Sequence, residues 1–126
     1  MLGLSANLNY YLFNGNVDLR KGIFRLCESI REEMSLDPSD ASNVYMFMSR
    51  NRKVVKILHY ERGFYVLYEK RPVMGKFKKP VFDEVSRCYR IQWSDMAYLT
   101  ESIVVDLSLI HTSSSAASDV YKRQAL

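Results

Sequence analysis

Between residues 43 and 72 the chain carries three consecutive stretches in which apolar residues recur at alternate positions. The stretches NVYMFMS, KVVKILHYE and FYVLYEKRP are rich in β-branched and aromatic residues, which is typical of strands. Short breakers, RNR and RG, separate them. A tight Arg62–Gly63 turn, with glycine supplying a positive φ, predicts a hairpin of the second and third stretches. We therefore expect an antiparallel sheet.

Upstream of these strands the apolar period changes to that of a helix. A short aromatic strand, YYLF at 10–13, is followed by a helix predicted at about 18–35, with Asp18 as a suitable N-cap. The apolar stripe of this helix comprises Leu19, Ile23, Leu26, Cys27, Ile30 and Met34. An amphipathic helix must bury its stripe, so we expect the helix to pack on one face of the sheet.

Two further strands and a second helix follow. KFKKPVF, with an edge-type Pro80, and RCYRIQW have strand character, and SDMAYLTESI predicts a short helix at about 94–104 capped by Ser94. The order β-α-β-β-β-β-α predicts an α+β fold with a mainly antiparallel sheet of four to five strands, one long amphipathic helix and one short C-terminal helix. We assign residues 1–106 to a single domain.

The last twenty residues differ in character from this domain. Residues 107–111, LSLIH, and 120–124, VYKRQ, can be encoded by one DNA string in opposite orientations, and that string resembles a transposon-derived sequencing adapter. Our hypothesis is that 107–126 is a non-native tail. We predict that deleting the tail leaves the melting temperature unchanged, and a loss of several degrees would show that it is an integral element.

Composition excludes several classes of protein. The chain has 126 residues, of which 48% are hydrophobic, so it is expected to fold rather than to remain disordered. It has neither a long apolar span nor a signal pattern, which favours a cytoplasmic location. Cys27 and Cys88 are expected to be ordinary reduced thiols.

The positive charge lies wholly in the middle of the chain. Residues 50–90 hold twelve Lys and Arg against four Asp and Glu, whereas 1–49 and 91–126 each have a net charge of −2. Such asymmetry favours a polyanionic partner, namely DNA, although a solvated sheet face explains it equally well. The candidate phosphate contacts are Arg50, Arg52, Lys53, Lys70, Arg71, Lys76, Lys78 and Lys79. Base stacking or strand packing are the alternative roles for Tyr60, Tyr65 and Tyr68.

The start of the first predicted helix carries a second candidate site. Arg20 and Lys21 follow Asp18 in what is predicted to be the first turn, where the helix dipole disfavours cations. Two cations at a helix N-terminus suit a phosphate or a partner carboxylate. The alternative is an internal salt bridge, to Asp18 or to a carboxylate of the sheet.

Patterns for catalysis are missing from the sequence. The two histidines are not arranged as metal ligands, and the chain contains neither a nucleophile elbow nor a glycine-rich phosphate loop. We therefore predict a protein that is not an enzyme and that holds neither a metal nor a cofactor.

Several motifs resemble a known family. MLGL at the start, VDLRKG at 17–22, VYMFMSRNRKVVKILHYERGFYVLYEKR at 44–71, GKF and RIQW are similar to the TnpB-type accessory proteins, the second open reading frame, of IS-sixty-six-like insertion sequences. The resemblance covers residues 1 to about 104. Tyr60, Pro72 and Ser102 depart from the usual Trp, Leu and Gly, and the basic tail that is common in the family is missing.

The resemblance implies a role in DNA transposition beside a separate DDE-type transposase, which carries out strand transfer, and possibly beside another accessory protein. Two functions remain open at this stage. The chain either binds DNA through its basic surface or is an interaction subunit that binds the transposase or another accessory protein without contacting DNA.

Overall fold

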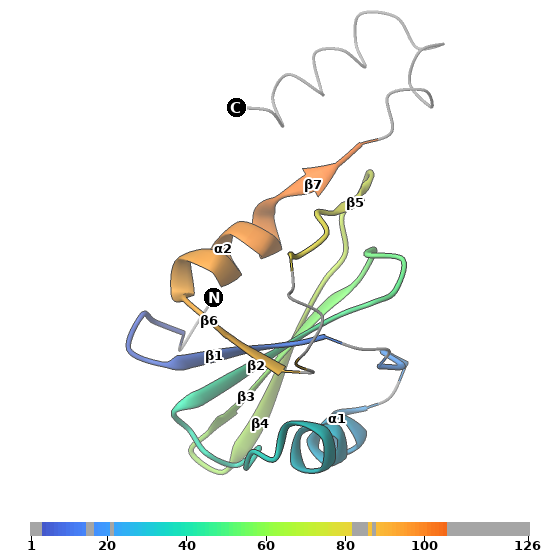
Figure 1. Ribbon diagram of the computed structural model, residues 1–126. Helices are drawn as coiled ribbons and strands as arrows, with labels where there is room; N and C mark the ends of the chain where they lie inside the picture. Colours follow the sequence, from blue (N-terminus) through green and yellow to red (C-terminus); the bar gives the residue numbers. More distant parts are fainter. Residues whose placement is uncertain (1–3, 15–16, 21, 82–85, 87, 106–126) are drawn as a thin grey trace, which may run out of the picture.

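The computed structural model describes residues 4–14, 17–20, 22–81, 86 and 88–105. A five-stranded sheet in the order β4-β3-β2-β1-β6 forms its centre (Figure 1). Its strands, in chain order, are β1 Asn9–Phe13, β2 Asn43–Met48, β3 Val55–Glu61, β4 Phe64–Lys70 and β6 Cys88–Ile91. The predicted α+β class and the mainly antiparallel sheet are confirmed.

The three middle strands form the predicted antiparallel meander. Strand β2 pairs with β3, and β3 pairs with β4 along its whole length. Arg62 and Gly63 both have positive φ, +49° and +87°, which is the signature of the two-residue turn that matches strand twist. The parallel pair of β1 and β2 is the exception in the sheet, and β1 lies antiparallel to β6.

The helices cover opposite faces of the sheet (Figure 1). Helix α1, Ile23–Ser29, continues as a π-helix, η1, Ile30–Met34, and its Leu26 and Ile30 are fully buried against the aromatic residues of β2. Helix α2, Trp93–Glu101, packs Met96 and Leu99 on the other face. The predicted packing of the amphipathic stripe on the sheet is confirmed, with Leu19 and Ile23 partly buried.

The predicted long helix at 18–35 is wrong in its length. It begins at Ile23, after an extended Gly22, because the Asp18 carboxylate accepts the Arg20 amide within a local turn instead of capping a helix. It ends at Met34, since Ser35 adopts the left-handed conformation at φ +54°.

The predicted cap of the second helix is also wrong. Gln92, not Ser94, is the N-cap of α2, and it exchanges hydrogen bonds with Asp95 in a capping box. The helix ends at Glu101, so the apolar residues that follow it belong to a short strand, β7, Ile103–Val104.

The predicted strand at 76–82 is much shorter than expected. Strand β5 spans only Lys76–Phe77 and pairs with β7 outside the main sheet. Phe77 is buried, whereas Val81 is exposed, so the segment leaves the core before Pro80. The tail 107–126, and residues 82–85 and 87 of the segment joining β5 to β6, lie outside the described residues.

Gly75 is required by the close approach of β7 to β5, and we predict that Gly75→Ala is destabilising. The residue has φ +78°, and an added Cβ would lie 2.3 Å from the Val104 carbonyl oxygen. Thermal unfolding is expected to show a loss of about 1–3 kcal/mol. Gly22→Ala is the matched control, because its added Cβ meets nothing within 4 Å and its φ is −78°. Equal losses in both variants would contradict the clash.

Candidate nucleic-acid interface

Two cationic segments meet at one end of the sheet. The first is the turn between β2 and β3, and the second follows Gly75 and includes β5. The Phe77 amide donates to the Arg52 carbonyl at 2.8 Å, which joins the two segments directly. We call the cations they carry the basic end, which comprises Arg50, Arg52, Lys53, Lys76, Lys78 and Lys79.

The turn between β2 and β3 is held in shape by its own polar side chains. The Ser49 hydroxyl accepts the amides of Lys53 at 3.1 Å and Val54 at 3.0 Å, and it donates to the Asn51 side chain at 2.8 Å. Arg52 takes a positive φ of 60° within this turn. The turn therefore presents Arg50 and Lys53 to solvent from a fixed backbone.

The segment 76–79 is anchored by one aromatic residue. Phe77 is 2% exposed and belongs to the same buried cluster as Met96 and Leu99. Because alternate residues of a strand point to opposite sides, burial of Phe77 leaves Lys76 and Lys78 exposed. The Lys78 amide donates to the Ser102 carbonyl at 3.1 Å, which fixes the end of the segment.

Lys78 also contacts the exposed face of α2. Its ammonium donates to the Tyr98 hydroxyl at 2.9 Å and lies 5.5 Å from the centre of the ring. This hydrogen bond raises the pKa of Lys78 and lowers the pKa of Tyr98. Both contacts hold the Lys78 ammonium against α2.

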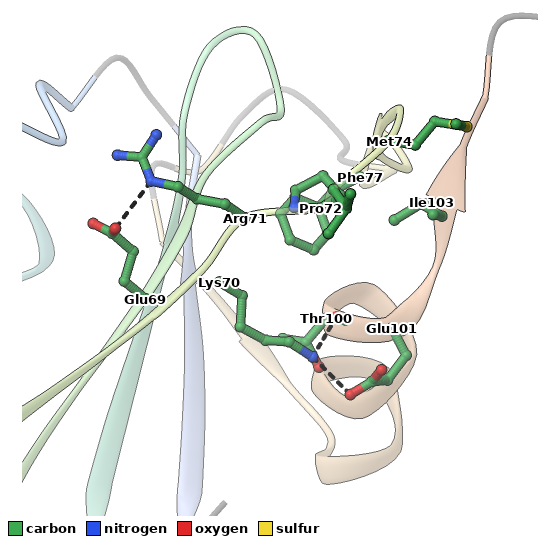
Figure 2. Close-up of a pocket in the computed structure, with 10 residues that line it drawn as sticks. Glu69, Lys70, Arg71, Pro72, Met74, Phe77, Thr100, Glu101 and Ile103 are labelled. Atoms are coloured by element: carbon green, nitrogen blue, oxygen red, sulfur yellow. Dashed lines mark hydrogen bonds and ion pairs between the residues drawn. The ribbon is translucent and has the colours of Figure 1, made fainter.

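The basic end differs from its neighbours in how its charges are compensated. None of its six cations forms an ion pair with a carboxylate of the described residues. Lys70 and Arg71 lie at the same end of the sheet, as predicted, because Lys70 pairs with Val55 at the start of β3. Both are bound internally, however, as Figure 2 shows.

The internal partners of Lys70 and Arg71 are well defined. The Lys70 ammonium lies 2.7 Å from the Glu101 carboxylate and donates to the Thr100 carbonyl at 2.9 Å. The Arg71 guanidinium lies 3.0 Å from Glu69, and this contact holds the pKa of that carboxyl below its usual range. A phosphate would have to compete with these carboxylates, so these two residues are weaker candidates than the basic end.

Arg20 forms the internal salt bridge to Asp18 that the sequence suggested as the alternative to an anion site. Its guanidinium forms two hydrogen bonds of 3.0 Å to the two oxygens of Asp18. The residue precedes the helix instead of occupying its first turn, so the expected conflict with the helix dipole does not arise. Lys21 lies outside the described residues.

Sequence reasoning missed a buried lysine, Lys56, that contacts Leu19 and Glu69. Lys56 is 8% exposed, and its ammonium donates to the Leu19 carbonyl and lies 3.6 Å from Glu69. It thereby ties the segment before α1 to the face of β3 and β4. A lysine inside the otherwise apolar stretch VVKIL was the available signal, because a cation at a core position needs a partner.

We predict that Lys56→Met destabilises the domain by about 1–3 kcal/mol, because the partly buried Leu19 carbonyl loses its donor. Chemical denaturation measures the effect. Lys53→Met, an exposed neighbour of the same type, is expected to change stability by less than about 0.5 kcal/mol. A Lys56 variant as stable as the control would show that this tether contributes nothing.

A hollow of about 650 Å³ lies beside the basic end, between the end of β4 and the α2–β7 segment (Figure 2). Phe77 and Ile103 belong to its apolar lining, and the Lys70–Glu101 pair closes one side. Val73 and Met74 on its rim are exposed. The basic end is thus bordered by an apolar surface.

The arrangement suits anion binding. Several cations without a carboxylate partner among the described residues, held on a fixed backbone, match phosphate oxygens, which position a protein on DNA without reading its sequence. Among the described residues, no three His, Cys, Asp or Glu side chains gather as a metal cluster. No helix in that part of the chain has the length and apolarity to cross a membrane.

The fold and the basic end define a small α+β protein with a surface suited to polyanions. A family model described as IS66 Orf2 like protein, TnpB type, matches residues 8–108, and the chain belongs to this family. It is therefore an accessory protein of insertion-sequence transposition, in agreement with the resemblance of its motifs. No curated protein and no solved structure matches the chain.

Proposed function

We propose that this accessory protein is non-catalytic and binds DNA through the phosphate backbone, using the basic end. The observation that carries the proposal is the meeting of two cationic segments whose side chains have no carboxylate partner among the described residues. Cations without a carboxylate partner gain more from a phosphate than cations already in an ion pair, because no ion pair has to be broken. Strand transfer is left to the separate transposase.

Backbone contacts predict affinity without strong sequence preference. Binding of the full chain to a fluorescent duplex carrying an insertion-sequence end is therefore expected to resemble binding to a shuffled duplex of equal length. Fluorescence anisotropy at low salt measures both affinities. Absence of binding to either duplex at 50 mM salt, a condition that favours phosphate contacts, would contradict the proposal.

The alternative function is an interaction subunit for the transposase. The exposed Val73 and Met74 beside the basic end favour it, because an apolar patch rimmed by charge is typical of protein interfaces. In that case Met74→Asp weakens binding to purified transposase, and the wild-type protein does not bind DNA. Neutralising the basic end separates the two functions. If this change abolishes DNA binding and leaves transposase binding intact, DNA binding is the favoured function.

A further inference from the structure

Strand β4 is an open border of the sheet. It pairs with β3 from Phe64 to Lys70, and among the described residues no strand pairs with its other side. The register with β3 is continuous, and the strand has no proline. Natural sheets usually protect such an edge with prolines, bulges or charges, because unpaired N–H and C=O groups accept another strand. In β4 the only charged residues are Glu69 and Lys70, both at one end.

The hairpin turn determines which backbone groups face this border. Across a two-residue loop, the flanking residues, here Glu61 and Phe64, form a hydrogen-bonded pair, and every second pair thereafter does the same. The backbone groups of Tyr65, Leu67 and Glu69 therefore point away from β3, toward the open border.

Exposed aromatic side chains lie along the same border. Phe64 is 70% exposed at the start of β4, and Phe24 of α1 is 76% exposed. The ring centres of Phe24 and Tyr65 lie 6.3 Å apart in an edge-on arrangement, and the ring centres of Tyr60 and Tyr65 lie 5.2 Å apart. Large exposed apolar groups beside unpaired backbone mark an interaction surface.

We propose that the open border of β4 binds the β4 strand of a second copy of this chain, antiparallel and with Leu67 on the twofold axis. When two residues lie opposite each other in an antiparallel pair, the backbone N–H and C=O groups of both must point toward the partner strand, or those of both must point away from it. Centring the pair on Leu67 meets this condition and pairs all seven residues of β4. It places Tyr65 opposite Glu69 of the second copy and Leu67 opposite its own equivalent.

Charge supports this register. In this register no two like charges lie opposite each other, since Glu69 lies opposite Tyr65 and Lys70 lies opposite Phe64 of the second copy. Moving the axis to Val66 would place Arg62 opposite Lys70, and a parallel pair in register would place Glu69 against Glu69. Because β4 carries one acid and one base, its border suits another copy of itself better than it suits a polyanion.

Sedimentation equilibrium of the full chain tests the proposal. The wild-type mass is expected to approach twice 14.7 kDa. Leu67→Lys and Leu67→Glu are each expected to be monomeric, because like charges then meet on the axis, and an equimolar mixture of the two is expected to regain the dimer. Val73→Lys, at a fully exposed position outside β4, is the matched control and is expected to stay dimeric.

Hydrogen exchange provides a readout that does not depend on the variants folding. In the wild type, the amides of Tyr65, Leu67 and Glu69 are expected to gain protection as protein concentration rises, whereas the inward-facing amides of β4 do not change. A monomeric wild type at every concentration, dimeric Leu67 variants, or a mixture that stays monomeric would each overturn the proposal.

Discussion

Phe77→Ala is expected to destabilise the domain by about 3–5 kcal/mol, because it empties a buried aromatic site. Phe77 joins β5 to the cluster that contains Met96 and Leu99, and few other residues of its segment reach the core. The corresponding fall in melting temperature is roughly 10–20 °C for a domain of this size. Differential scanning calorimetry measures both quantities.

The same variant is expected to weaken DNA binding even at temperatures at which it remains folded. Phe77 lies between Lys76 and Lys78, so its loss frees the segment that presents them. Met74→Ala is the control: this half-exposed neighbour lies in the same segment, and its loss should have a small effect on stability. Full DNA affinity in a folded Phe77→Ala protein would show that anchoring of this segment is irrelevant to binding.

Simultaneous replacement of Lys76, Lys78 and Lys79 by Ala is expected to reduce DNA affinity by about 10- to 100-fold for any sequence. Each lysine is exposed and has no carboxylate partner among the described residues, so each is available to a phosphate. Stability is expected to change by less than about 0.5 kcal/mol per site, because exposed charges contribute little. Anisotropy titration and thermal unfolding provide the two measurements.

A matched control removes the same charge elsewhere. Arg25, Arg31 and Arg62 are exposed and lie outside the basic end, on or beside α1 and at the β3–β4 turn. Their triple Ala variant has the same net charge as the lysine variant. If both variants lose affinity equally, overall charge rather than the basic end governs binding.

The strands were predictable because their signal is local. Alternating apolar residues and the Arg62–Gly63 turn specify the β2–β3–β4 meander without help from distant parts of the chain. The buried stripe of α1 was also predictable, since Leu26 and Ile30 follow the helical period. Antiparallel pairing of β3 and β4 alone places the turn between β2 and β3 at the same end of the sheet as the end of β4.

The errors arose where tertiary contacts or side-chain competition decide the backbone. The start of α1 is set by Asp18, which binds the Arg20 amide and guanidinium instead of capping the helix. The short β5 depends on Gly75 and on a partner strand, β7, that was assigned to a helix. The role of Lys56 depends on a carbonyl 37 positions away, which periodicity cannot reveal.

The salt dependence of DNA affinity tests the central proposal most directly. If the six cations of the basic end each neutralise one phosphate, the slope of log K against log salt is about −5 for the wild type. The Lys76, Lys78 and Lys79 triple Ala variant is then expected to give a slope of about −3, with the arginine control unchanged. A wild-type slope near zero, or an unaltered slope in the lysine variant, would contradict binding through the basic end.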